Sequence, residues 1–241
     1  MDFLRSPVLL YFAGYGLFTL LLFVTSARSA NRLFDKNGFV SGPLLLLKLH
    51  IIGIILFGIV PLLAHPPARI GISGILSLEN LPLWITSILV LSIIILSAYP
   101  VEKDVRDLTQ RTGINLTWDP NYIPVYFIIR ILFICAYEWW FRGHLLFDCI
   151  RNFGVPVSVL INVILYSLLH LVNGKKEMIA CIPFGLLLCC MCIWADAAWP
   201  AIAIHLALTV SYEGRFLQKL KKIKSAAHED FNNGSIRLYR K

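Results

Sequence analysis

Long apolar stretches recur along the chain, each close to the roughly 20 residues that a transmembrane helix needs. Charged residues are concentrated between these stretches rather than inside them. We expect spans at residues 7–26, 43–64 and 82–99, from 123 onward, between 151 and 175, between 177 and 196, and at 198–214. The pattern predicts an all-α, polytopic membrane helix bundle of about seven transmembrane helices.

The composition supports this class. Hydrophobic residues make up 58% of the chain and charged residues 15%, against about 45–50% and 25% in soluble domains. These values exclude a soluble enzyme, a nucleic-acid-binding module and a disordered protein, and they make the lipid bilayer the first expected partner. The six cysteines lie within or beside the apolar stretches, so we expect free, buried thiols.

Charge sets the expected orientation. The net charge of +8 reflects basic segments between the spans, and the positive-inside rule then favours an N-out, C-in arrangement. We expect an integral, multi-pass membrane protein, located in the cell membrane if its source is prokaryotic. Three parts are predicted: three helices within 1–119, a helix bundle at 120–214 and a basic cytoplasmic tail at 215–241. Residues 101–121 are expected to form a charged loop.

Ionisable residues inside the fourth span are the first candidates for function, because charges within a membrane are costly and rare. Glu138 and Arg142 lie four residues apart, so on a helix they share a face and can pair. Arg130 lies in the same span, where it is expected to pair or to snorkel toward the interface. His50, near the start of the second span, is expected close to the inner interface.

Two later spans each carry a histidine on a polar face, together with other polar residues at steps of four. Glu138 and His170 lie equally far from Gly154, a predicted turn, so an antiparallel hairpin puts them at one depth. At 1.5 Å per residue, His205 falls roughly 10 Å from that level. Thr209 and Glu213 follow His205 on the same face of its helix.

One glutamate and two histidines are the components of a general-base site or a metal site. His170 and His205 can ligate zinc through neutral imidazole while Glu138 activates water. The spacing is not that of the local H-E-x-x-H motif. A structural role is the alternative, with Glu138 and Arg142 joining helices and the histidines forming interhelical hydrogen bonds.

These positions resemble a known family. Residues 138–143, EWWFRG, resemble the glutamate–arginine motif of the CPBP (Abi) family, intramembrane proteases named for CAAX processing and bacteriocin self-immunity. Residues 166–170, YSLLH, are similar to its second motif, and residues 198–205, AWPAIAIH, resemble the segment that leads to its last histidine. The resemblance covers residues 120–214.

The resemblance implies hydrolysis of a membrane-associated or lipidated peptide, in which a glutamate activates water. In the family the first motif glutamate is the main base, and Tyr137 holds its place here, so either Glu138 takes that role or the activity is lost; Arg142 is the neutralising partner. His170 and His205 would orient the water or ligate a divalent metal such as zinc. Thr209 takes the place of an asparagine on the oxyanion side and can donate a hydrogen bond.

One position departs from the motif. Tyr137 stands where the family has its first glutamate, and a phenol cannot serve as a carboxylate base. The leading hypothesis is therefore a glutamate-type intramembrane endopeptidase based on Glu138. The alternative is a catalytically inactive membrane immunity or regulatory protein of the same fold. A small transporter is a third hypothesis, but no inverted repeats or paired interrupted helices are visible.

Overall fold

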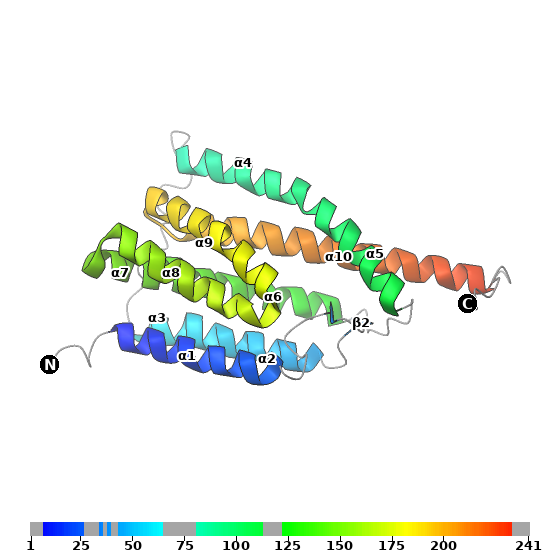
Figure 1. Ribbon diagram of the computed structural model, residues 1–241, viewed down its shortest axis with the longest axis horizontal. Coiled ribbons are helices and arrows are strands. Elements are labelled where there is room, and N and C mark those ends of the chain that lie inside the picture. Colours follow the sequence, from blue (N-terminus) through cyan, green and yellow to red (C-terminus); the bar gives the residue numbers. More distant parts are fainter. Residues whose placement is uncertain are drawn as a thin grey trace.

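The computed structural model describes residues 7–26, 34–35, 38–39, 43–64, 81–112 and 122–232 (Figure 1). Within them the regular structure is helical except for one two-residue antiparallel pairing, β1 (Phe34–Asp35) with β2 (Gly38–Phe39), so the all-α prediction is confirmed. The helices are α1 (Pro7–Ser26), α2 (Pro43–Ile54), η2 (Ile55–Ile59), α3 (Val60–Ala64), α4 (Leu81–Leu96), α5 (Ala98–Thr112), α6 (Tyr122–Glu138), η3 (Trp139–Leu145), α7 (Leu146–Phe153), α8 (Val155–Leu169), η4 (His170–Asn173), α9 (Lys175–Ala195) and α10 (Trp199–Asn232).

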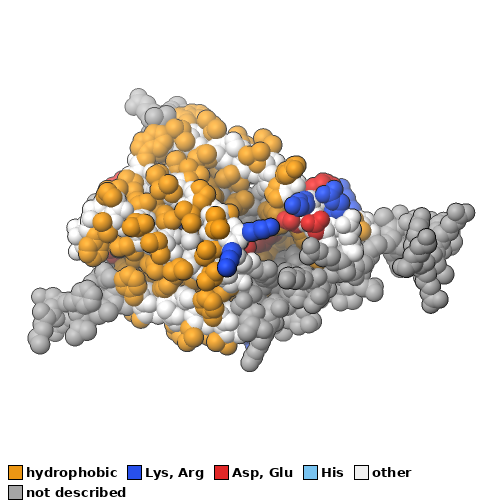
Figure 2. Space-filling model, in the orientation of Figure 1, with side chains coloured by type: hydrophobic (Ala, Val, Ile, Leu, Met, Phe, Trp, Pro, Cys, Tyr) orange, Lys and Arg blue, Asp and Glu red, His pale blue; other side chains and the backbone are white. Residues whose placement is uncertain are grey.

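Five helical stretches are long and apolar enough to cross a membrane, which indicates a multi-pass integral membrane protein. Figure 2 shows hydrophobic side chains over much of one face, with charged side chains gathered toward the end where α5 lies. The first expected span corresponds to a shorter apolar stretch, and the seventh to the first half of α10. The five are Leu45–Leu63, Pro82–Gln110, Tyr122–Phe153, Val155–Asn173 and Lys175–Ala195, and the shorter one is Leu10–Thr25.

The N-out, C-in orientation stays a prediction, as do the three predicted parts. The basic segment expected from residue 215 begins inside α10, which continues past Gly214 without a break. Phe216 and Leu220 are buried on this continuation. They pack with residues of α5, which explains why the helix does not end where the composition changes.

The charged loop expected at residues 101–121 is wrong over its first half, because α5 is a helix from Ala98 to Thr112. Its apolar residues Val101, Val105 and Leu108 fall on one face and are buried against α10. An amphipathic helix can therefore use this charged stretch, with its polar face outward. The rest of that expected loop, residues 113–121, lies outside the described residues.

In Figure 1, α8, α9 and α10 lie between α4 on one side and α1 and α2 on the other. A core of aromatic side chains joins α1 and η2 to the long helix α6–η3–α7 and to α8. The turn predicted around Gly154 is confirmed: this glycine adopts φ 75° between α7 and α8. All six cysteines are free, as expected, and five of them are buried or half-buried.

Candidate active site

Glu138 lies at the end of α6, fully buried, and both of its carboxylate oxygens have partners. Arg142 donates to Oε2 at 2.8 Å, and the Nδ1 of His205 lies 2.5 Å from Oε1. Arg142 is also fully buried, so the predicted pairing of these two charges is confirmed. Two hydrogen-bonded partners compensate the cost of placing a carboxylate in this dry interior.

Arg142 is held by aromatic rings as well as by Glu138. Its guanidinium carbon lies 4.3 Å from the centre of the Tyr166 ring and 5.3 Å from that of Phe141. Gly185 of α9 leaves the space that these groups need, because a Cβ there would lie 3.1 Å from Tyr166 and 3.6 Å from Arg142. The ion pair is thus fixed by packing from three helices.

The motif EWWFRG runs directly into a π-helix, η3, which begins at Trp139. The wider turn still brings Arg142 beside Glu138 and leaves the Phe141 carbonyl accepting two hydrogen bonds. One comes from the backbone N–H of Leu146 and the other from Asn162 Nδ2 of α8, at 2.6 Å. π-Helical turns are rare and are frequent at functional sites.

His205 contacts Glu138 directly. The rise per residue along the helices had predicted a different depth for His205 from that of Glu138 and His170. The chain reverses between α9 and α10 over three residues, beginning with Asp196 in the left-handed conformation at φ 47°. Ala198, just before α10, and Ala201 are fully buried, and a Cβ at Gly143 of η3 would lie 3.5 Å from that of Ala198, so the start of α10 packs closely against η3. The sharp turn and the close approach bring His205 to Glu138.

His170 is the first residue of η4, the 3-10 turn that follows α8. Its Nδ1 lies 2.9 Å from the backbone carbonyl of Tyr166, one turn earlier. It does not contact the Glu138 carboxylate, which His205 does. The two histidines that the sequence singled out therefore have different hydrogen-bond partners.

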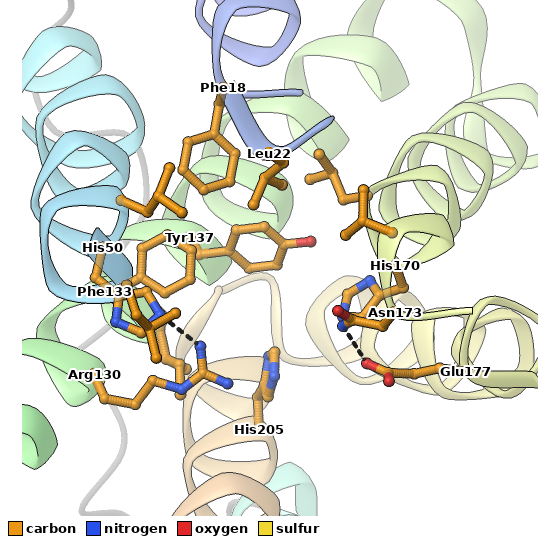
Figure 3. A pocket seen from close by; sticks show the side chains of 15 residues that line it. Phe18, Leu22, His50, Arg130, Phe133, Tyr137, His170, Asn173, Glu177 and His205 are labelled. Atoms are coloured by element: carbon orange, nitrogen blue, oxygen red, sulfur yellow. Dashed lines mark hydrogen bonds between the residues drawn. The ribbon is translucent and has the colours of Figure 1, made fainter. Parts of the chain in front are cut away.

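A cavity of about 150 Å³ lies beside this cluster, lined by α1, α2, α6, α8, η4, α9 and α10. Figure 3 shows His205 and His170 facing it from two sides, with Tyr137 reaching across it. The wall toward α1 is apolar, and most polar side chains lie opposite. The lining residues are Phe18, Leu22, Leu46, Leu49, His50, Arg130, Phe133, Ile134, Tyr137, Leu169, His170, Val172, Asn173, Glu177 and His205.

A second charged network borders the cavity, and the sequence did not predict its contacts. Arg130 lies 3.1 Å from the Nε2 of His50 and 3.2 Å from the carboxylate of Glu213. Tyr126 donates to the same carboxylate at 2.9 Å. The available signal was a set of ionisable residues inside apolar spans, but α2, α6 and α10 are distant in sequence, so spacing alone could not pair them.

The last two positions singled out from the sequence, Thr209 and Tyr137, differ in whether they line the cavity. Thr209 lies one turn beyond His205 and is buried, but it is not one of the residues that line the cavity. Tyr137 lines the cavity and is 4% exposed. The structure therefore brings together Glu138, Arg142 and His205, places His170 across the cavity, and leaves Thr209 outside its wall.

A catalytic zinc takes three protein ligands. In the part of the chain that the structure describes, no three His, Cys, Asp or Glu side chains are grouped so that they could hold a metal ion. Glu138 is engaged by Arg142 and His205, and the Arg130 guanidinium faces the same cavity. His170 and His205 are only two donors, so zinc ligation by them stays a prediction that would need a further ligand.

Comparison with known proteins gives a family match to the part of the chain that contains these residues. Residues 119–211 match the family model described as type II CAAX prenyl endopeptidase Rce1-like. No curated protein and no solved structure matches the chain. The matched segment contains Glu138, Arg142, His170 and His205, and it agrees with the resemblance found from the motifs. Residues 119–211 therefore form a domain of the Rce1-like, type II CAAX prenyl endopeptidase (CPBP) family.

Proposed function

We propose that this protein is an intramembrane endopeptidase that hydrolyses a peptide bond of a membrane-associated or lipidated peptide. The observation that carries the proposal is the Glu138–His205 pair, in which His205 contacts a fully buried carboxylate and also lines the cavity. A carboxylate and a histidine so arranged can take a proton from water and return it to a leaving group.

The hydrogen bond to Glu138 sets the chemistry of the imidazole. With Nδ1–H donating to Oε1, Nε2 is the nitrogen that can accept a proton on the other edge of the ring. Water in the cavity attacks the scissile carbonyl carbon as His205 takes its proton, and the positive charge that forms is balanced by Glu138. The C–N bond then breaks and the proton passes to the departing amine.

Arg142 and His170 support this reaction from opposite sides. Arg142 balances the charge of Glu138 away from the cavity, so the carboxylate has one oxygen left for His205. His170, across the cavity, is positioned to hold the attacking water or the peptide. The apolar wall formed by α1 with Leu46 and Leu49 of α2 suits the hydrocarbon of a lipidated peptide, which agrees with the prenyl endopeptidase family.

The test is a cleavage assay with the full chain purified in detergent and a fluorogenic peptide that carries a prenylated cysteine. Glu138→Gln and His205→Ala should each lower the cleavage rate by about 10²–10⁴-fold, the usual contribution of a general base. His170→Ala should also lower it. This variant is a second probe that should disturb folding little, because the one hydrogen bond described for the His170 side chain is to the backbone carbonyl of Tyr166, one turn earlier.

Asp148→Asn is the matched control for Glu138→Gln. Asp148 is a buried carboxylate of the same long helix, pairs with Arg151 and lies outside the cavity wall. This variant should cleave at the wild-type rate. Cleavage by Glu138→Gln at that rate would overturn the mechanism, and absence of cleavage by the wild-type protein across prenylated and unmodified peptides would overturn the activity.

Tyr137 in the place of a motif glutamate favours a second function, that of a non-enzymatic membrane immunity or regulatory protein. In that case the buried ion pair acts only in stability. Glu138→Gln would then reduce cellular function in proportion to the loss of folded protein. A variant that reaches wild-type levels in the membrane and is still inactive supports the enzyme instead.

A further inference from the structure

The hydroxyl of Tyr137 is buried and has no hydrogen-bond partner in the described part of the chain. The side chain is 4% exposed and lines the cavity. Leaving a buried hydroxyl unpaired costs about 1–3 kcal/mol, which phenylalanine at this position would avoid. Figure 3 shows the hydroxyl directed across the cavity rather than into the surrounding helices. Its partner is therefore expected to be a molecule that enters the cavity.

The ring that carries this hydroxyl is fixed by its neighbours. Its centre lies 4.6 Å from that of Phe141, 5.7 Å from Phe133, 5.8 Å from Phe57 and 6.0 Å from Tyr166. A donor held by packing on several sides needs no reorganisation when charge develops beside it, and such preorganised donors are strong catalysts.

Tyr137 also lies next to the groups that activate water. It directly precedes Glu138, and its ring centre is 6.2 Å from that of His205, with the rings nearly perpendicular. Other polar side chains of the cavity already have side-chain partners: Arg130 contacts Glu213, and Asn173 donates to Glu177.

We propose that Tyr137 is a catalytic residue whose O–H donates a hydrogen bond to the carbonyl oxygen of the scissile peptide bond. As water adds to the carbonyl carbon, negative charge collects on that oxygen and the phenol stabilises it, keeping its own proton throughout. Tyr137 thus supplies the oxyanion donor that the sequence assigned to Thr209. The inference rests on the proposed endopeptidase function.

The test compares Tyr137→Phe with the wild-type protein in the prenyl-peptide assay. Loss of one oxyanion donor should lower kcat by about 10²–10³-fold, with KM changed less than twofold, because the hydrogen bond strengthens only as charge develops. Binding of a peptidyl phosphonate, which carries a tetrahedral anionic centre, should weaken strongly. Thermal stability should equal or exceed that of the wild type, since an unpaired buried hydroxyl has been removed.

Tyr15→Phe is the matched control. Tyr15 belongs to the same aromatic core, but its hydroxyl donates to the Leu165 carbonyl at 2.9 Å and it does not line the cavity. This variant should lose stability and keep its kcat. The inference is overturned if Tyr137→Phe keeps kcat within twofold of wild type, raises KM alone, or loses activity only through unfolding. If Tyr137→Phe keeps its kcat while Glu138→Gln is inactive, the endopeptidase proposal stands and only the role of Tyr137 is overturned. An inactive wild-type protein overturns both proposals.

Discussion

Replacing Arg142 by methionine removes the guanidinium that balances the buried Glu138 carboxylate. Both side chains have 0% exposure and their charged atoms lie 2.8 Å apart. Removing one partner of such a pair leaves an uncompensated charge, at a cost of about 3–5 kcal/mol. The cation–π contact with Tyr166, at 4.3 Å, is lost as well. His205 still hydrogen-bonds Glu138, which keeps the total within this range.

The measurement is thermal unfolding of the full chain in detergent, followed by tryptophan fluorescence. For a chain of this size, each kcal/mol corresponds to about 2–4 °C in Tm, so Arg142→Met should lower Tm by about 10 °C. The double variant Glu138→Gln/Arg142→Met removes both charges and should recover much of this loss. We expect a coupling energy of about 2 kcal/mol or more from the cycle.

Arg151→Met is the control for removing an arginine whose own charge stays in contact with solvent. Arg151 contacts Asp148 on the same long helix, and its side chain is 63% exposed although Asp148 is buried. Because solvent screens a pair with such an exposed partner, Tm should fall less than for Arg142→Met. The reasoning on the buried pair is refuted if Arg142→Met shifts Tm no more than Arg151→Met does, or if the single and double variants lose equal stability.

Two further predictions concern the packing around the site and use the same unfolding assay. Gly53→Ala should cost about 1–3 kcal/mol, as overpacking does, because its Cβ would overlap the Phe133 ring; Gly16→Ala, where a Cβ meets nothing within 4 Å, should leave Tm unchanged or higher. Asn162→Leu should cost about 1–3 kcal/mol by removing the fully buried donor to the Phe141 carbonyl. Wild-type stability of Gly53→Ala or of Asn162→Leu would contradict the corresponding contact.

Local spacing predicted the parts of the site that one helix determines. Glu138 and Arg142 lie four residues apart, and a helical turn brings such residues together. The prediction holds even though the turn is π-helical, because the side chains are long enough to accommodate a wider turn. The turn at Gly154 was also local, since a glycine followed by Pro156 favours a break between two helices.

The contacts between distant helices could not be predicted in this way. Rise arithmetic assumes straight, parallel helices, and the left-handed Asp196 and the small residues of α10 change where His205 lies. Arg130 was recognised as an intramembrane charge, but its partners His50 and Glu213 belong to other helices. Residues 101–112 were expected to form a loop because they carry many charges. The few apolar residues among them form a helix face that α10 covers.

One oxygen of the Glu138 carboxylate pairs with Arg142 and the other with His205. We expect the first contact to serve stability and the second to serve the reaction. Arg142 is fully buried on the side packed by Tyr166 and Gly185, so its substitution should act first on folding. His205 and Tyr137 lie on the side of the cavity, and the Tyr137 hydroxyl makes no contact that folding needs. Phenylalanine at position 137 would lose no described hydrogen bond, so the hydroxyl favours a role beyond folding. The arrangement supports the proposed active site, in which one side of the charge is held rigid and the other is left open to react.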